Sequence, residues 1–356
     1  MAVSGEVDIE DLIPQEECVL TLTNFGYVKR QKMDTYRTQR RGGRGISGMS
    51  RREEDVATEM FVINSHDYVM FFTSTGRVYR LKCYEIPEGS RTSKGMNIAN
   101  LLPITAEEKV TSMIRVPEFD EEKYLVMVTR NGIIKRTLLS AYNSARKGGL
   151  IAIDLDEGDA LSWVRVTSGH DDLVVATKKG WAIRFHEEDI RELGRTARGV
   201  RAMKLQPGDE LIDMSRLEEG QQILAITTGG YGKRTDPDQY REQGRNGMGI
   251  RAMALTDRTG ELAAQLAVYE NEDIMLITDD GTIIRMAVSD IRESGRNTQG
   301  VRLMRLSGGA KIVGVARAEQ EEPEEADEAA FEEAVAKMTD ETETVVDGSD
   351  GGDEEI

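Results

Sequence analysis

The sequence predicts an all-β protein built as a ring of six propeller-type blades, and three observations predict it. A short apolar run, then Thr-x-x-Gly, then Arg four residues after the glycine, recurs six times. A second phrase that opens with Gly follows each Arg after 13 to 15 residues. The glycines of the first phrase lie 48 to 56 residues apart, with a mean of 51. Repeats of this length with about four strands each are typical of propellers, in which stacking buries the faces that a single blade leaves open.

The first phrase predicts a β-hairpin in each unit. Its apolar runs have four or five residues rich in Val, Ile, Leu, Phe and Met, which is the length of a buried strand. The glycine after each run supplies the positive φ that a tight turn requires. These glycines are Gly26, Gly76, Gly132, Gly180, Gly230 and Gly281. The residues that follow each glycine are then the returning strand.

The second phrase predicts the rest of each blade. Residues 199–205, 249–255 and 300–306 are near copies of one another, and 95–101 and 149–155 are looser copies. A further strand is expected in the run before the next unit, as in 109–116, 161–166 and 211–217. Six blades then occupy residues 18–317. Because the fifth unit contains Pro237 and the glycine-rich stretch 228–232, we expect its blade to be the least regular.

Charge divides the chain into three parts. The whole chain has a formal net charge of −18, of which residues 318–356 carry −16 and residues 1–17 carry −6. The remaining 18–317 is net +4, so the acidic total does not exclude a nucleic-acid partner for this body. We expect 318–356 to be a disordered acidic tail, because it has too few large apolar residues to offset the entropy of ordering. We expect 1–17 to be a linker from a segment upstream.

Several classes of protein are excluded. Cys18 and Cys83 are the only cysteines, which excludes a disulfide scaffold and suits a reducing cytoplasm. The His and Cys residues have no metal-ligand spacing, so we expect no metal site. No apolar run approaches the roughly 18 residues of a membrane helix, and the start has no signal-peptide pattern. We also find no nucleophile–base pair, and residues 229–234 have the wrong spacing for a phosphate-binding P-loop.

The loop of the first unit differs from all the others. Residues 36–46 read Tyr-Arg-Thr-Gln-Arg-Arg-Gly-Gly-Arg-Gly-Ile. Glycines let backbone N–H groups approach an anion closely, and the arginine fork matches phosphate oxygens. With no aromatic residues interleaved for base stacking and no helix to enter a groove, the pattern indicates contact with a nucleic-acid backbone without base reading. The alternative is a solvated basic loop that pairs with acidic neighbours.

This loop also carries a resemblance to a known family. It matches the seven-residue box of gyrase A, with Arg at a position where Lys is common. The matching residues are Gln39, Arg40, Arg41, Gly42, Gly43, Arg44 and Gly45. Box and sixfold repeat together resemble the C-terminal domain of DNA gyrase A over residues 18–317, and residues 9–14 look like the connector from the catalytic core.

The resemblance implies a fold, a function and partners. The fold is a β-pinwheel, a propeller-like ring whose neighbouring blades exchange strands. The domain would bend double-stranded DNA around its rim so that strand passage yields negative supercoils, and the box would latch the wrap. The implied partners are the gyrase A catalytic core in the same chain and the separate gyrase B protein. ATP and magnesium would act in those parts, so we expect no cofactor and no catalytic residue here. The isolated domain is expected to be monomeric and cytoplasmic.

Basic residues in blade register are the predicted DNA contacts along the rim. One set follows the hairpin glycine: Lys29, Arg30, Arg77, Arg80, Lys135, Arg136, Arg184, Lys233, Arg234 and Arg285. The other set precedes the glycine that opens the second phrase, which we call the closing glycine because this phrase closes the unit: Arg91, Lys94, Arg146, Lys147, Arg195, Arg198, Arg245 and Arg296. An Arg that recurs in every unit has an alternative role, which is to pair with carboxylates between blades.

Two other functions stay open at this point. The equivalent domain of topoisomerase IV is one, although six full repeats and an intact box argue against it. A propeller that serves as a protein-interaction platform is the other, although no kelch or WD signature is present. A DNA titration with a steep dependence on salt separates DNA binding from the interaction platform.

Overall fold

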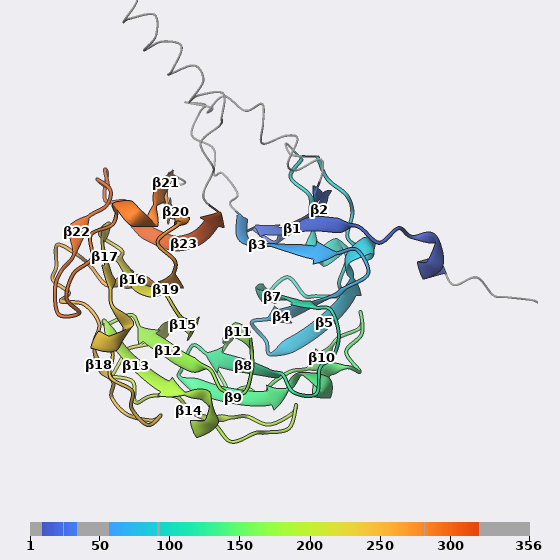
Figure 1. Cartoon of the computed structure of the whole chain (residues 1–356), viewed down its shortest axis with the longest axis horizontal. Helices are drawn as coiled ribbons and strands as arrows, with labels where there is room; N and C mark the ends of the chain where they lie inside the picture. Colours follow the sequence, from blue (N-terminus) through green and yellow to red (C-terminus); the bar gives the residue numbers. More distant parts are fainter. Residues whose placement is uncertain (1–8, 24, 34–56, 91–92, 281, 320–356) are drawn as a thin grey trace, which may run out of the picture. The chain divides into compact units, whose positions relative to one another are not determined.

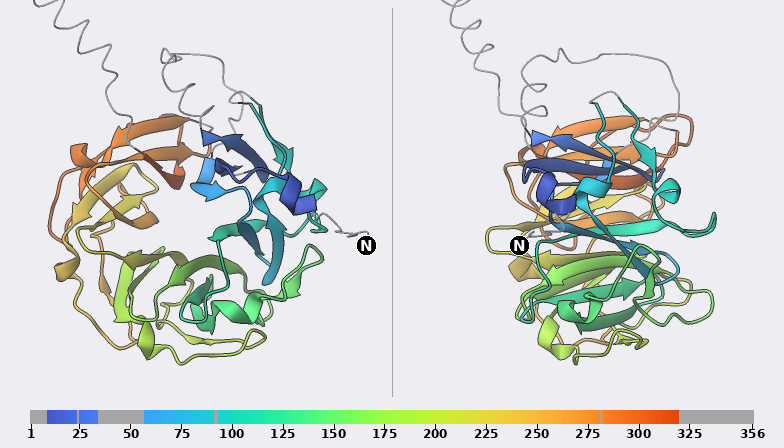
Figure 2. Two further views of the ribbon diagram at one scale, coloured as in Figure 1. Left: turned by 45° about the vertical axis from the view of Figure 1, so that its right-hand side comes forward. Right: turned by 90° about the vertical axis from the view of Figure 1, so that its right-hand side faces the viewer.

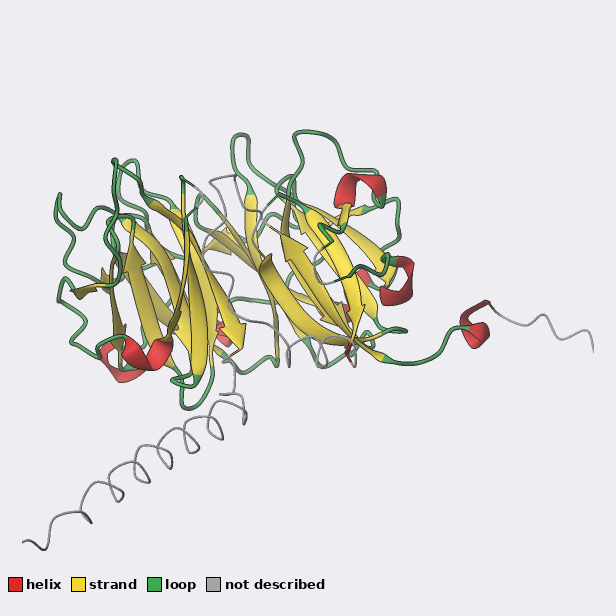
Figure 3. Ribbon diagram, turned by 90° about the horizontal axis from the view of Figure 1, so that it is seen from above, coloured by secondary structure: helices red, strands yellow, loops and turns green. Residues whose placement is uncertain are grey.

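A computed structural model of the chain shows six β-sheets arranged in a ring (Figure 1). It describes residues 9–23, 25–33, 57–90, 93–280 and 282–319. The chain divides into two units, Met1–Ala318 and Glu319–Ile356, and the first of these holds the blades. Figure 3 shows strands joined by loops and short 3-10 turns. The predicted all-β ring of six blades is confirmed.

Five blades have four strands each, and the sixth has three within the described residues. The first holds β3 (Ala57–Asn64), β1 (Glu17–Thr23), β2 (Tyr27–Lys32) and β6 (Met96–Asn97). The second holds β7 (Val110–Val116), β4 (Tyr68–Thr73), β5 (Arg77–Lys82) and β10 (Leu150–Ile151). The third holds β11 (Leu161–Thr167), β8 (Tyr124–Thr129), β9 (Ile133–Leu138) and β14 (Val200–Arg201).

The remaining blades follow the same order. The fourth holds β15 (Leu211–Leu217), β12 (Asp172–Thr177), β13 (Trp181–His186) and β18 (Ile250–Arg251). The fifth holds β19 (Leu262–Val268), β16 (Gln222–Thr227), β17 (Tyr231–Thr235) and β22 (Val301–Arg302). The sixth holds β23 (Ile312–Glu319), β20 (Glu272–Thr278) and β21 (Ile283–Ala287). The colours of Figure 2 run around the ring in chain order.

The outermost strand of each four-stranded blade comes from the next unit of the sequence. β14 follows the β12–β13 hairpin of the fourth blade, yet it pairs with β9 of the third blade, where Val200 lies opposite Ile134. β6, β10, β18 and β22 are exchanged in the same way. Figure 1 places β10, β14 and β18 at the periphery and β7, β11 and β15 toward the centre. This exchange ties consecutive blades together through the backbone and is the pinwheel that the resemblance implies.

The recurring Thr-x-x-Gly is a hairpin turn that the threonine side chain helps to close. In the third blade, the Gly132 amide donates to the Thr129 carbonyl at 3.1 Å, and the Ile133 amide donates to Thr129 Oγ1 at 3.1 Å. Gly132 has φ of +90°, in the region that glycine adopts without steric cost. The same hydroxyl contact is made by Thr23, Thr177, Thr227 and Thr278.

Both faces of the second to fifth sheets are buried because neighbouring blades stack on them. In β8, Leu125 and Met127 pack toward the second blade, whereas Val126 and Val128 pack toward the fourth. All four side chains have 0% exposure. Successive side chains of a strand point to opposite faces, so a strand between two blades requires an unbroken apolar run. Full burial of such side chains is worth about 1.5–3 kcal/mol each, which makes stacking the main source of stability.

Short 3-10 turns follow the returning strands of five blades. They are η2 (Cys83–Glu85), η4 (Leu139–Tyr142), η5 (Glu187–Asp189), η6 (Pro237–Gln239) and η7 (Val288–Asp290). Two further turns are η1 (Ile9–Leu12) and η3 (Ile98–Asn100). Among the described residues, no helix has the length and hydrophobicity to cross a membrane.

The expectation of an irregular fifth blade is wrong. That blade has four strands in the same order as its neighbours. Pro237 opens η6, after β17 has ended, at a first position of a turn where a missing N–H costs little.

Candidate nucleic-acid interface

The predicted basic residues differ in what their side chains contact. The box, residues 39–45, and Arg91 lie outside the described residues. The other candidates divide into side chains that join consecutive units and side chains that face solvent.

The Arg four residues after the hairpin glycine holds the 3-10 turn of the next unit. Arg136, whose side chain is 11% exposed, donates from Nη1 to the carbonyls of Glu187 and Ile190 at 3.2 Å each. Its Nε also lies 3.6 Å from the Glu187 carboxylate. Carbonyls in or next to the following turn accept from four more of these arginines: Arg30, Arg80, Arg184 and Arg234. The inter-blade role is therefore present in five blades, and its main acceptors are carbonyls.

Lysines next to these arginines donate hydrogen bonds to backbone carbonyls of the domain. Lys135 is fully buried, and its Nζ donates to the carbonyls of Ala152 and Arg195. Burial, together with the nearby charge of Arg195, lowers the pKa of Lys135 to about 7. Lys29 and Lys233 donate in the same way to loop carbonyls of the next unit. These ammonium groups are occupied by the backbone of the domain itself.

Arginines that precede the closing glycine hold the outer strands. Arg195 donates from Nη1 to the carbonyl of Ile151, the second residue of β10, at 2.6 Å. Arg245 and Arg296 make the same contact to the second residue of β14 and of β18. Each of them joins the outer strand that it precedes to the outer strand of the blade before.

The other described candidates are more accessible. Lys94, Arg146 and Lys147 are exposed. Arg198, whose side chain is 51% exposed, pairs with Asp156 through Nε and Oδ1 at 2.5 Å. The half-buried Arg77 donates to the Tyr79 hydroxyl at 3.3 Å, and the exposed Arg285 donates to the Asp273 carboxylate at 2.7 Å. Arg198 and Lys94 contact the preceding unit, because Asp156 follows β10 and Lys94 Nζ lies 4.1 Å from the centre of the Tyr27 ring of β2, whereas Arg146 and Lys147 face solvent.

The structure adds a set of arginines that the sequence analysis did not single out. Arg201, Arg251 and Arg302 occupy the second position of β14, β18 and β22, and all three are exposed. They therefore lie at equivalent points on the outer edge of three successive blades (Figure 1). The sequence signal for them is an Arg two residues after Gly199, Gly249 and Gly300. Within the described ranges, no group of three His, Cys, Asp or Glu side chains gathers as a metal site would need.

Comparison with known proteins identifies the family. A family model described as "DNA gyrase C-terminal domain, beta-propeller" matches the chain once per blade. The six matches cover residues 19–64, 67–117, 123–168, 171–218, 221–264 and 272–319. The chain belongs to this family.

Full-length relatives support the assignment of this gyrase C-terminal domain. The DNA gyrase A protein of Halalkalibacterium halodurans is 50% identical over 335 residues, which are 93% of this chain and 40% of that protein. The DNA gyrase A protein of Clostridium acetobutylicum is 42% identical over 321 residues, 90% of this chain and 39% of that protein. The chain therefore spans about two fifths of the length of these relatives.

Two solved structures share the fold of this gyrase domain. The C-terminal domain of DNA topoisomerase IV superposes with a TM-score of 0.75 at 26% identity, covering 90% of this chain and 99% of that one. A DNA gyrase A C-terminal domain superposes with a TM-score of 0.68 at 25% identity, covering 85% and 100%. The two topoisomerases thus share this architecture, and the relatives of 42–50% identity are gyrase A proteins.

Proposed function

We propose that this domain binds double-stranded DNA without base specificity and bends it around its outer edge, so that gyrase introduces negative supercoils. The observation that carries the proposal is the row of exposed arginines Arg201, Arg251 and Arg302 on successive outer strands. Guanidinium groups suit phosphate oxygens, and repeated backbone contacts fix the path of a duplex without reading its sequence. Membership of the gyrase family supports the same role.

Bending explains why the contacts have to be repeated. Bending 20–30 base pairs by 40–90° costs on the order of 1–6 kcal/mol. Contacts spread around a ring offset that cost along the whole path, whereas a single strong site would hold the duplex at one point. The net charge of +4 on residues 18–317 suits such a distributed interaction.

In this proposal the box latches the wrap. Residues 39–45 combine Arg40, Arg41 and Arg44 with three glycines, which is a composition suited to phosphate. They belong to the first of six units. In a closed ring the first unit neighbours the sixth, where a wrap would be completed.

The acidic tail has a modulating role in this proposal. Residues 318–356 carry −16, which exceeds the +4 of the body. A polyanion of this kind competes with DNA for a basic surface. The alternative role for the tail is to keep the protein soluble.

The domain acts as part of a larger enzyme in this proposal. The gyrase A catalytic core in the same chain and the separate gyrase B protein supply DNA cleavage and ATP hydrolysis in the bacterial cytoplasm. This domain contributes no catalytic residue and no cofactor site, and in isolation it is a monomer.

A topological assay tests the proposal. A nicked plasmid is incubated with increasing amounts of the chain, sealed with ligase and freed of protein, and its linking number is counted. Wrapping shifts the linking number in one direction as protein increases.

Replacing Arg40, Arg41 and Arg44 with Ala should abolish the shift and leave DNA binding largely intact. Tight binding by the unmodified chain without any shift would contradict wrapping, and equal loss of shift and binding in the triple variant would contradict the latch. Absence of salt-dependent DNA binding would favour a protein-interaction platform instead.

A further inference from the structure

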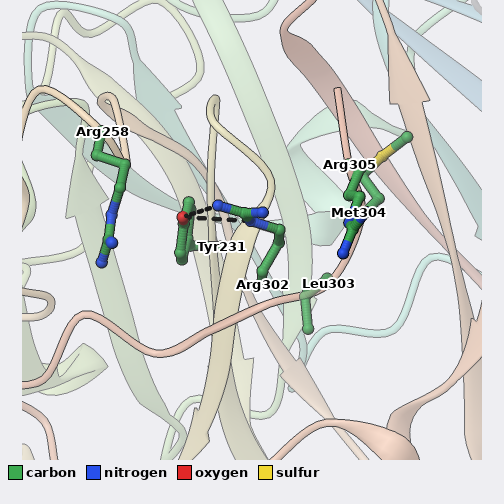
Figure 4. Close-up of a pocket in the computed structure, with 6 residues that line it drawn as sticks. All are labelled: Tyr231, Arg258, Arg302, Leu303, Met304 and Arg305. Atoms are coloured by element: carbon green, nitrogen blue, oxygen red, sulfur yellow. Dashed lines mark hydrogen bonds between the residues drawn. The ribbon is translucent and has the colours of Figure 1, made fainter. Parts of the chain in front are cut away.

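The fifth blade has a pocket at its outer strand, β22. It has a volume of about 520 Å³ and is lined by Tyr231, Arg258, Arg302, Leu303, Met304 and Arg305 (Figure 4). Its arginines come from two parts of the chain, the loop before β19 and the segment that begins at β22. Figure 4 shows the ring of Tyr231 between Arg258 and Arg302. Two guanidinium groups thus flank one aromatic side chain.

Both guanidinium groups are held in place by neighbouring side chains. Arg302 donates from Nη2 and Nε to the Tyr231 hydroxyl at 2.9 and 3.3 Å. The guanidinium of Arg258 lies 5.3 Å from the centre of the Tyr231 ring and donates to Gln299 Oε1 at 3.3 Å. Tyr231 is only 6% exposed, so its ring is a fixed support. Side chains that are already positioned lose less conformational entropy when they bind a ligand.

The arginines of the pocket have no carboxylate partner in the part of the chain that the structure describes. Within the described residues, no carboxylate oxygen lies within 4.0 Å of a side-chain nitrogen of Arg258, Arg302 or Arg305. By contrast, Arg136 and Arg234 each pair with a carboxylate at 3.6 and 3.1 Å. Gathered guanidinium groups repel one another, and an oxyanion that accepts hydrogen bonds from both sides relieves that repulsion. The chemistry of the pocket is therefore that of a phosphate site.

Among the third, fourth and fifth blades, the arrangement is specific to the fifth. The fourth blade has Trp181 and Arg251 at the matching positions, 5.3 Å apart. However, its loop before β15 is one residue shorter and carries Pro207 and Gly208 where the fifth blade has Arg258. In the third blade, Ile133 lies opposite Arg201. Only the fifth of these three blades combines an aromatic ring with two arginines.

We propose that Arg258 and Arg302, positioned by Tyr231, clamp one phosphodiester of the bound duplex. This assignment rests on the proposed DNA binding and gives it a defined anchoring point. A free phosphate ion presents the same oxygens to the same donors, so the test has to separate the two sources.

The first arm measures DNA binding by the full chain across a range of salt concentrations. Each phosphate neutralised on B-DNA contributes about 0.9 to the slope of log affinity against log salt. R258Q/R302Q should therefore lower the magnitude of that slope by about 0.9 relative to the unmodified chain. K109Q/K123Q removes the same charge from exposed lysines outside the pocket and should leave the slope closer to that of the unmodified chain. Equal slopes for R258Q/R302Q and the unmodified chain would overturn the clamp.

A conservative pair of substitutions guards against a folding defect. R258K/R302K keeps the charge and loses the planar forks, so it should keep most of the slope and bind DNA more weakly. Unchanged affinity in this variant would overturn the clamp, because a point charge would then serve equally well. Thermal unfolding midpoints close to that of the unmodified chain establish that the variants are folded.

The second arm is a calorimetric titration with inorganic phosphate. If phosphate binding is lost in R258Q/R302Q while the DNA slope is unchanged, the pocket takes a free ion and the DNA assignment is overturned. If the unmodified chain wraps DNA and R258Q/R302Q has the same slope of log affinity against log salt as the unmodified chain, the clamp fails and the proposed function stands. If the unmodified chain does not bind DNA, both fail.

Discussion

At the scale of single residues, the recurring Arg serves the architecture of the ring. Arg234 has an 8% exposed side chain, donates from Nε to the Ile291 carbonyl at 2.6 Å and from Nη1 to Gln222 Oε1 at 2.8 Å. A guanidinium offers five donors in a fixed fork, which suits an acceptor set spread over two units better than the compact ammonium of lysine. The constant spacing of this Arg along the chain therefore follows from the geometry of the junction between blades.

Replacing Arg234 with Gln should destabilise the domain by about 1–3 kcal/mol, because buried acceptors lose a charged donor. The measurement is the free energy of unfolding in urea. R305Q is the matched control, since Arg305 is exposed and its loss should stay within about 0.5 kcal/mol. Equal unfolding free energies for the two variants would contradict the junction role of Arg234.

The buried Lys135 should give the stability of the domain a specific dependence on pH. Its pKa is lowered to about 7 in the folded chain, whereas that of an unfolded lysine is about 10.4. Between these values the unfolded chain holds a proton that the folded chain lacks, so the free energy of unfolding rises with pH. The stability that this pKa difference contributes is fully present above the pKa of lysine in the unfolded chain. It is lost as the pH falls through about 7, the pKa of Lys135 in the folded chain.

K135M should therefore gain less stability than the unmodified chain between about pH 7 and pH 10. The measurement is the difference in unfolding free energy between the two ends of this range. K109M changes an exposed lysine and should gain as much as the unmodified chain. A K135M gain equal to that of K109M would show that the buried ammonium group does not titrate in this range.

At the scale of elements, the closing glycine lets each outer strand approach the blade before it. Gly249 has φ of +74° and precedes β18, and a Cβ there would lie 2.4 Å from the Ala182 carbonyl of β13. Gly158 has a similar φ of +76°, and nothing lies within 4 Å of its Cβ position. The two glycines share a backbone conformation and differ in the space around them.

Comparing G249A with G158A separates these two effects. G158A should cost about 1–2 kcal/mol, which is the penalty of the left-handed conformation for a residue with a Cβ. G249A should cost a further 1–3 kcal/mol or so, because β18 has to move away from β13. Thermal unfolding midpoints of the two variants measure the difference. Equal midpoints would mean that close approach of the outer strand is not required.

Local patterns made the hairpins predictable, whereas the exchange of strands depends on pairing across the sequence. Thr129 and Gly132 form their turn within four residues, so the sequence shows the hairpin directly. Val200 pairs with Ile134 in the preceding blade, and nothing in a two-residue strand specifies which blade it joins. Only the family resemblance implied that exchange.

The roles of the basic residues could be predicted only in part from the sequence, because they too depend on contacts between distant parts of the chain. Arg136 and Lys135 bind backbone carbonyls, which every residue possesses, so no sequence pattern distinguishes them from basic residues that face solvent. Arg201, Arg251 and Arg302 recur at the same position of the second phrase, so the sequence shows them as a set. Their place at the outer edge became evident only once β14, β18 and β22 were assigned to the preceding blades.

At the scale of the whole molecule, two regions of opposite charge belong to one chain. Residues 18–317 are net +4 and residues 320–356 are net −15. Because β23 ends at Glu319, a truncation after that residue removes the acidic segment and leaves the last strand intact. If the segment competes with DNA for the basic edge of the ring, its removal should strengthen DNA binding.

The gain in affinity should be largest at low salt, because the competition is electrostatic and is screened within about 10 Å at 0.1 M. Fluorescence anisotropy of a labelled duplex at about 50 and 200 mM salt measures it. A chain whose residues 320–356 are replaced by an equally long uncharged segment is the control, and it should bind as tightly as the truncated chain. If only the truncated chain gains affinity, the segment acts through its bulk. If neither gains at about 50 mM salt, the acidic residues do not compete with DNA, and the basic edge is open to a duplex in the intact chain.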